Sequence, residues 1–170
     1  FSVCSSDLLA TSFDGKGLGR INDLVVAKNG HVYFTSGGAF HMTPQGEVSA
    51  VGTDLRTNGI MLSRDERTLY ITNGATVVAL DVQADGSVIN QRNFARLEAG
   101  GNGDGMTVDA AARLYVTSAP GVQVFPPQAP AVHVSVPAEA QAPTPHVVAR
   151  VRFSSVAPSQ SLSRLSQISA

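Results

Sequence analysis

A short segment that occurs three times constrains the fold of this chain more than any other feature. Each copy begins with Asn or Asp, continues with an apolar run and a polar turn, and ends in a tyrosine followed two residues later by a threonine. The copies are NDLVVAKNGHVYFTS from Asn22, NGIMLSRDERTLYITN from Asn58 and DGMTVDAAARLYVTS from Asp104. The three tyrosines of the chain all occupy this position: Tyr33, Tyr70 and Tyr115. Such internal similarity predicts a repeat architecture.

Each copy has the residue chemistry of a β-hairpin. In the first copy, two short β-rich runs flank Asn29-Gly30, which supplies the positive φ that tight hairpin turns need. Further strands follow around Gln45-Gly46 and Asp85-Gly86, so that each repeat provides about four strands. Four-stranded antiparallel sheets at a period of roughly 40 to 50 residues are typical of a β-propeller. We therefore expect an all-β fold, a partial β-propeller of about three four-stranded blades with each tyrosine ring packed between blades.

The composition changes sharply near residue 126. Residues 1–125 contain all 16 glycines and two of the nine prolines, whereas residues 126–170 contain seven prolines and no glycine. We therefore expect incomplete propeller blades over 1–125 and a Pro/Ala/Ser-rich tail over 126–170 that is irregular and poorly ordered, or that results from an altered reading frame. An incomplete propeller has exposed sheet edges, which would allow self-association.

Charge and cysteine content exclude several classes of partner. With 12 basic and 13 acidic residues and a net charge of −1, the chain has no basic surface for nucleic acid or an anionic membrane. No apolar run reaches the roughly 18 residues of a spanning helix. The first residues include neither an initiator Met nor a signal-peptide pattern, so we expect an upstream start and favour the cytoplasm over secretion without assigning a localisation. A single cysteine, Cys4, excludes an internal disulfide and a cysteine-based zinc site.

The residues that open the three repeats all carry side-chain oxygens. Since the first strand of every propeller blade lines one central channel, we expect Asn22, Asn58 and Asp104 to converge there and to hold a hard divalent cation. The alternative is that the Asn-Gly and Asp-Gly pairs at positions 58 and 104 are merely turns, as such pairs recur along the chain. Asn22-Asp23 is not a favoured turn, however, and the aligned residues follow loops and enter a strand. Both interpretations stay open at this point.

The same segments resemble motifs of the gluconolactonase/regucalcin (senescence-marker-protein) family of six-bladed β-propellers. GKGLGRINDLVVAKNGHVYFTS is similar to the family's GKxLxxPNDLVVxxxGxIYFTD, TNGIMLSRDERTLYITN to PNGLAFSPDExxLYVxD, and GNGDGMTVDAAARLYVT to xPDGMxVDxxGxLYVA. The resemblance covers roughly residues 10–125 and implies that the blades come from a six-bladed propeller.

The resemblance also implies a metal-dependent lactonase that hydrolyses a small-molecule sugar lactone or related lactone to the hydroxy acid. Its cofactor would be one divalent cation, with Ca²⁺ favoured and Mg²⁺ or Zn²⁺ as alternatives. By this resemblance Asn58 and Asp104 would bind the cation, Asn22 would contact the cation or the substrate, and Arg20 would hold the substrate. Asp104 would also be the catalytic base.

Three departures from the family pattern weaken this expectation. The family's glutamate ligand lies in a first blade to which no part of this chain is similar, Ser36 and Asn73 replace aspartates, and no blade motif follows Phe125. A missing carboxylate weakens cation binding. We therefore expect a fragment whose own activity can be lost, and a non-catalytic propeller that serves as a binding scaffold stays the alternative function.

Overall fold

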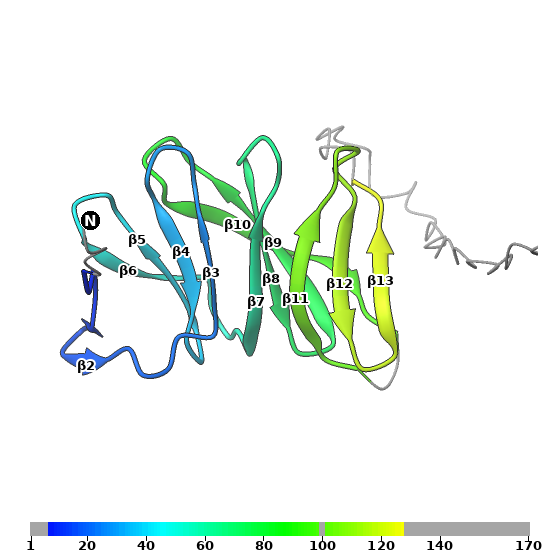
Figure 1. The fold of residues 1–170 in the computed structure, drawn as a ribbon, viewed down its shortest axis with the longest axis horizontal. Helices are drawn as coiled ribbons and strands as arrows, with labels where there is room; N and C mark the ends of the chain where they lie inside the picture. The colour runs from blue at the N-terminus through cyan, green and yellow to red at the C-terminus, as the bar shows by residue number, and fades with distance from the viewer. Residues whose placement is uncertain (1–6, 99–100, 128–170) are drawn as a thin grey trace, which may run out of the picture. The chain divides into compact units, whose positions relative to one another are not determined.

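The computed structural model describes residues 7–98 and 101–127, and these form antiparallel sheets without any helix (Figure 1). The first sheet consists of β3 (Asp23–Val26), β4 (Val32–Thr35), β5 (Ala39–Met42) and β6 (Val48–Val51). The second consists of β7 (Thr57–Leu62), β8 (Thr68–Asn73), β9 (Thr76–Val82) and β10 (Val88–Arg96). The third consists of β11 (Gly103–Val108), β12 (Leu114–Ser118) and β13 (Gly121–Phe125), and a small ribbon pairs β1 (Ser12–Phe13) with β2 (Lys16–Gly17).

The order of strands in each sheet is that of a propeller blade. Consecutive strands pair antiparallel, so each sheet is a meander that starts with its inner strand. The first strands of the sheets adjoin one another, because both β3 and β11 contact β7 (Figure 1). The expected all-β partial propeller is confirmed, except that the third sheet has three strands rather than four within the described residues.

Other expectations about the ends of the chain are not addressed by this part of the structure. The division at residue 126 and the total of six blades stay predictions, and the tail from residue 128 onward lies outside the described residues. In the described ranges, no helix has the length and apolarity needed to cross a membrane.

Apolar side chains on alternate strand positions pack consecutive sheets together. Between the first and second sheets lies a core that includes Tyr33, Ile60 and Ile71, and between the second and third lies one that includes Tyr70 and Val116. This arrangement follows from the two-residue period of a strand, which gives each sheet two separate faces. Both faces of the second sheet are buried in this way. Each Å² of apolar surface removed from water contributes about 25 cal/mol to the free energy of folding.

Two of the repeated tyrosines lie between sheets, as expected. Tyr33 is fully buried and its hydroxyl donates a hydrogen bond to the Gly86 carbonyl of the second sheet at 2.8 Å. Burial raises the pKa of Tyr33 to about 12. Tyr70 is buried against the ring of Phe94, with 4.8 Å between the ring centroids. Tyr115 is only half-buried, and its hydroxyl donates to Asp109 within its own hairpin.

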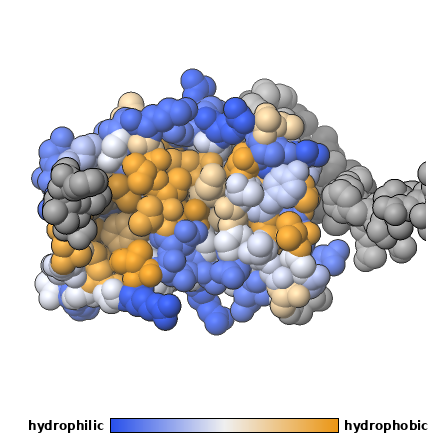
Figure 2. All heavy atoms as spheres, in the orientation of Figure 1, coloured by the Kyte–Doolittle hydropathy of each residue, from blue (hydrophilic) through white to orange (hydrophobic). Residues whose placement is uncertain are grey.

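The first sheet leaves apolar side chains exposed on its other face. Leu24 and Val26 of β3 are 54% and 56% exposed, while Phe34 of β4 is covered by residues that include Phe13 and Leu18. Figure 2 shows apolar surface concentrated where Figure 1 places β3 and β4. Only the N-terminal segment covers part of this face within the described residues.

The hairpin turns share one residue in the left-handed conformation. Gly30, Gly46 and Gly86 have φ values of 88°, 89° and 80°, and each amide donates to the carbonyl three residues earlier. The Asn29-Gly30 turn is therefore confirmed. Glu66 and Ala112 occupy the same turn position with φ values of 58° and 59°, although a Cβ atom makes that conformation unfavourable.

Replacing Ala112 with glycine is expected to raise the free energy of unfolding by about 0.5–1 kcal/mol, because glycine adopts positive φ without the steric cost of a Cβ atom. Urea unfolding of the full chain measures the change. Ala110→Gly in the same turn is the control, and there the added chain flexibility should leave stability unchanged or lower. A loss of stability in Ala112→Gly would contradict the prediction.

A pair of histidines lies at the end of β3 remote from Asn22. His31 Nδ1 and His41 Nε2 are 2.7 Å apart, and the two rings stack with 4.9 Å between centroids. Such a contact requires one nitrogen to be unprotonated. Burial, and secondly the nearby His31, lower the pKa of His41, against an opposing effect of Asp85.

His41 is expected to make stability fall as the pH falls below about 6.5, the ordinary pKa of histidine. With a lowered pKa, His41 stays neutral in the folded protein while the unfolded chain takes up a proton, so acid favours unfolding. Urea midpoints at pH 7.5 and 5.5 test this. His41→Gln, which cannot titrate, should show a smaller difference between the two midpoints, and an undiminished difference would refute the assignment.

Candidate functional site

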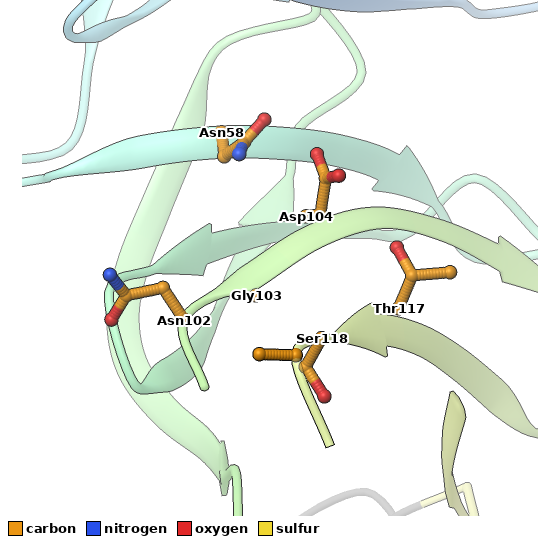
Figure 3. A pocket seen from close by; sticks show the side chains of 7 residues that line it. Asn58, Asn102, Gly103, Asp104, Thr117 and Ser118 are labelled. Carbon is orange, nitrogen blue, oxygen red and sulfur yellow. The ribbon is translucent and has the colours of Figure 1, made fainter. Parts of the chain in front are cut away.

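The residues that open the three repeats lie at the same end of adjacent inner strands. Asn22 directly precedes β3, Asn58 is the second residue of β7, and Asp104 is the second residue of β11. The Asn22 side-chain amide donates a hydrogen bond to Asn58 Oδ1. Figure 3 shows Asn58 and Asp104 on neighbouring strands with their polar groups on the same side, and both residues line one pocket. The structure therefore brings Asn58 beside both Asn22 and Asp104, although Asn22 itself lines neither pocket at this end of the strands.

None of the aligned pairs forms a turn. Asn58 and Gly59 lie within β7, Asp104 and Gly105 lie within β11, and no residue of either pair has a positive φ. By contrast, Gly30 and Gly86 of the hairpin turns do. The alternative that the pairs at 58 and 104 are turn corners is thus wrong.

Both strands instead carry a β-bulge at the site. In β7 the pairing passes from Thr57 with Asn73 to Ile60 with Ile71, so Asn58 and Gly59 together lie opposite the single residue Thr72. β11 shows the same shift, which leaves Asp104 and Gly105 opposite Thr117. A bulge adds local twist and redirects the side chain of the extra residue. The sequence signal for it was a glycine inside an apolar strand.

The second residue of the first two pairs brings neighbouring inner strands close together. A Cβ atom on Gly59 would collide with the Asp104 carbonyl oxygen and would lie 3.1 Å from the Cα of Gly105. In the first repeat this position is Asp23, whose carboxylate accepts a hydrogen bond from the backbone amide of Ile60 at 3.0 Å. Asp23 therefore joins β3 to β7, a role that the sequence pattern did not indicate.

The close approach at Gly59 predicts that Gly59→Ala displaces β11 and lowers the free energy of unfolding by about 1–3 kcal/mol, as overpacking does. Gly105→Ala is the matched control. It occupies the equivalent position, and its Cβ would meet only Thr117 Oγ1 at 3.8 Å. Thermal or urea unfolding of the two variants measures the difference, and equal stability of both would contradict the proposed collision.

The pocket at these strands is lined mostly by polar residues, one of which is acidic. Its volume is about 470 Å³, and its lining residues are Asn58, Asn102, Gly103, Asp104, Thr117, Ser118 and Ala119. A second pocket of about 330 Å³ shares Asn58 and Asn102 and adds the cationic residue Arg56. The sequence pattern did not single out Arg56, Asn102 or Ser118. Arg56 and Asn102 lie outside the repeated segments, and Ser118 is the last residue of the third copy.

The remaining predicted residue, Arg20, lies away from these pockets. It is exposed, and its backbone carbonyl accepts a hydrogen bond from Ser36 Oγ at 3.1 Å. Arg20 lines neither pocket, so the structure does not place its side chain beside Asp104. Its expected role in substrate binding stays a prediction.

The donor atoms at the site are oxygens of two amides and one carboxylate, which suit a hard cation such as Ca²⁺. Asn58 Oδ1 already accepts a hydrogen bond from Asn22. Within the described residues, no group of three or more His, Cys, Asp or Glu side chains could hold a metal ion. Any cation here would therefore depend on amide oxygens and on donors from outside this set.

Comparison with known proteins shows one family. The model of the family described as SMP-30/Gluconolactonase/LRE-like region matches residues 4–147. A gluconolactonase of Zymomonas mobilis subsp. mobilis (strain ATCC 31821 / ZM4 / CP4) is 27% identical over 150 residues, which cover 71% of this chain and 42% of the relative.

Solved structures show the same likeness. A gluconolactonase from Xanthomonas campestris superimposes with a TM-score of 0.63 at 29% identity, over 70% of this chain and 48% of that one. A luciferin-regenerating enzyme has a TM-score of 0.56 at 21% identity over 63% of this chain and 42% of that one, a likeness of fold alone. The chain thus spans about half the length of the relatives it matches.

Proposed function

Because the chain belongs to the SMP-30/gluconolactonase/LRE-like family, we propose that it forms part of a metal-dependent lactonase that opens a sugar-type or related lactone to its hydroxy acid. The observation that carries this proposal is the convergence of Asn22, Asn58 and Asp104 at one end of three inner strands, with the Asp104 carboxylate in a polar pocket. A small polar ring molecule with a carbonyl suits such a pocket.

The proposed cation is a single divalent ion. Ca²⁺ is favoured over Zn²⁺ because the donor atoms are hard oxygens, and over Mg²⁺ because Ca²⁺ accepts irregular sets of oxygen ligands whereas Mg²⁺ requires a nearly octahedral one. Asp104 and Asn58 would bind it, and Asn22 would contact either the ion or the substrate. The hydrogen bond from Asn22 supports this, since it holds the Asn58 side chain beside Asn22. When bound, the cation would polarise the lactone carbonyl. With one carboxylate in this set, the affinity depends on further oxygen donors.

The residues of the chain supply the proton transfers and the positioning. The Asp104 carboxylate would accept a proton from the attacking water as the new C–O bond forms at the lactone carbonyl. The ring C–O bond then breaks, and the departing oxygen takes that proton from Asp104 to become the hydroxyl of the product. Asn22 and Arg20 would hold polar groups of the substrate. In this step water adds across the ester bond and nothing is oxidised or reduced.

Asp104→Asn is expected to lower Ca²⁺-dependent lactone hydrolysis at least about 100-fold, because the amide can neither accept the proton nor carry charge toward the cation. The measurement is a pH-stat assay with an aldonolactone, on the full chain and on a version extended to the length of the relatives. Asp54→Asn is the matched control, since Asp54 has a φ of 53° that Asn tolerates and lines neither pocket. Unchanged turnover in Asp104→Asn would remove its catalytic assignment.

A non-catalytic propeller that binds a partner is the second candidate. One observation favours this candidate. In the described part of the chain, no three acidic, histidine or cysteine side chains form a group that could hold a metal ion. Calorimetric titration with Ca²⁺ separates the two functions. Binding that is lost in Asp104→Asn supports the lactonase, whereas an extended version without any cation binding supports the scaffold.

A further inference from the structure

The threonine two residues after each repeated tyrosine lies opposite the start of the inner strand of its own sheet. Thr35 pairs with Asp23 at the start of β3, and Thr72 and Thr117 face the bulges of β7 and β11. The hydroxyls of the first two also reach the next sheet. Thr35 Oγ1 donates to the Asn58 carbonyl at 2.5 Å, and Thr72 Oγ1 lies 3.3 Å from the Asp104 carbonyl. Thr35 and Thr72 therefore each contact the backbone of the site residue in the following repeat.

Thr72 joins the two bulged strands through one hydroxyl group. Its Oγ1 accepts a hydrogen bond from the Gly59 amide at 2.7 Å and shares its proton between the carbonyls of Gly59 and Asp104, each at 3.3 Å. Both Thr35 and Thr72 are fully buried, so water cannot replace these bonds. Without the hydroxyl, the buried Gly59 amide of the bulge would lose this acceptor.

The methyl group of Thr72 adds a steric restraint. A Cβ atom on Gly103, the residue before Asp104, would lie 2.6 Å from Thr72 Cγ2. The side chain of Thr72 is thus wedged between the β7 bulge and the start of β11. Because protein interiors are closely packed, a side chain in this position restricts both the position and the direction of β11, the strand that carries Asp104.

Thr117 provides an internal comparison. It has the same place in its repeat, but its hydroxyl donates to Gly105 of its own sheet at 3.1 Å and its side chain is exposed. Within the described residues, the first and second sheets are each followed by another sheet, and it is their threonines, Thr35 and Thr72, that make the cross-sheet bond. Thr117 itself lines the pocket, at its edge (Figure 3).

We propose that Thr35 and Thr72 are positioning residues, which hold the backbone of Asn58 and of Asp104 so that both side chains face the pocket. Thr72 has the larger effect because it is bonded to both inner strands, whereas Thr35 holds one. The consequence for cation binding rests on the proposed function, but the effect on the backbone does not.

The test compares Thr72→Val, which keeps the shape and removes the hydroxyl, with Thr72→Ser, which restores it. In the cation-free full chain, Thr72→Val should speed hydrogen exchange of the Gly59 amide at least about tenfold and shift the NMR signals of Asp104. Thr72→Ser should stay near wild type in both. Affinity for Ca²⁺, measured by calorimetry, should fall about tenfold in Thr72→Val and recover in Thr72→Ser.

A loss of general stability must be distinguished from a loss of position. Leu80→Ala truncates a buried side chain of β9 in the core between the first and second sheets, and should lower stability while leaving Ca²⁺ affinity and the Asp104 signals unchanged. If Leu80→Ala weakens Ca²⁺ binding as much as Thr72→Val does, or if Thr72→Val leaves the Asp104 signals in place, the proposal is overturned. If neither the full chain nor the version extended to the length of the relatives binds Ca²⁺, the proposed function fails, and the exchange and NMR comparison still decides whether Thr72 positions Asp104.

Discussion

Face-to-face packing of consecutive sheets is the interaction on which the rest of this structure depends. The second sheet buries Ile71 toward the first sheet and Tyr70 toward the third, so its two faces belong to two separate cores. Because the sheets pack in chain order, their first strands adjoin, and residues at equivalent places in the sequence meet at one end of those strands. The shared location of Asn58 and Asp104 is a direct result of this packing.

The geometry of the site depends on local irregularity as much as on the regular sheets. A strand without a bulge would send the side chains of successive residues to opposite faces, toward one core or the other. The extra residue at Asn58 and at Asp104 breaks that alternation where the strands begin, and Gly59 lets the backbone of β7 approach that of β11. Polar side chains can therefore enter a shared pocket while the apolar residues beyond them stay in the cores.

The repeated motif predicted the hairpins, the inner strands and the convergence of the site residues, because these follow from side-chain period and turn chemistry. It did not predict the bulges or the bonds of Thr35 and Thr72, since these depend on which residue lies opposite which across two strands. Asp23 was missed for the same reason, as its partner is the amide of Ile60 in another repeat. The position of Arg20 could not be read from its spacing to Asn22, because it lies in a loop before the first inner strand.

The direction of the cross-sheet hydrogen bonds has a consequence for how the chain folds during synthesis. Tyr33, Thr35 and Thr72 each donate to a carbonyl in the following repeat, 53, 23 and 32 residues later along the chain. The contacts are thus nearest-neighbour contacts, as in a stacked repeat protein, and none of these three waits for a distant segment. Each sheet that leaves the ribosome presents donors already in place for the one made next, so assembly can proceed vectorially from the N-terminus. The side-chain oxygens of Asn22, Asn58 and Asp104 would then be set in order as translation continues.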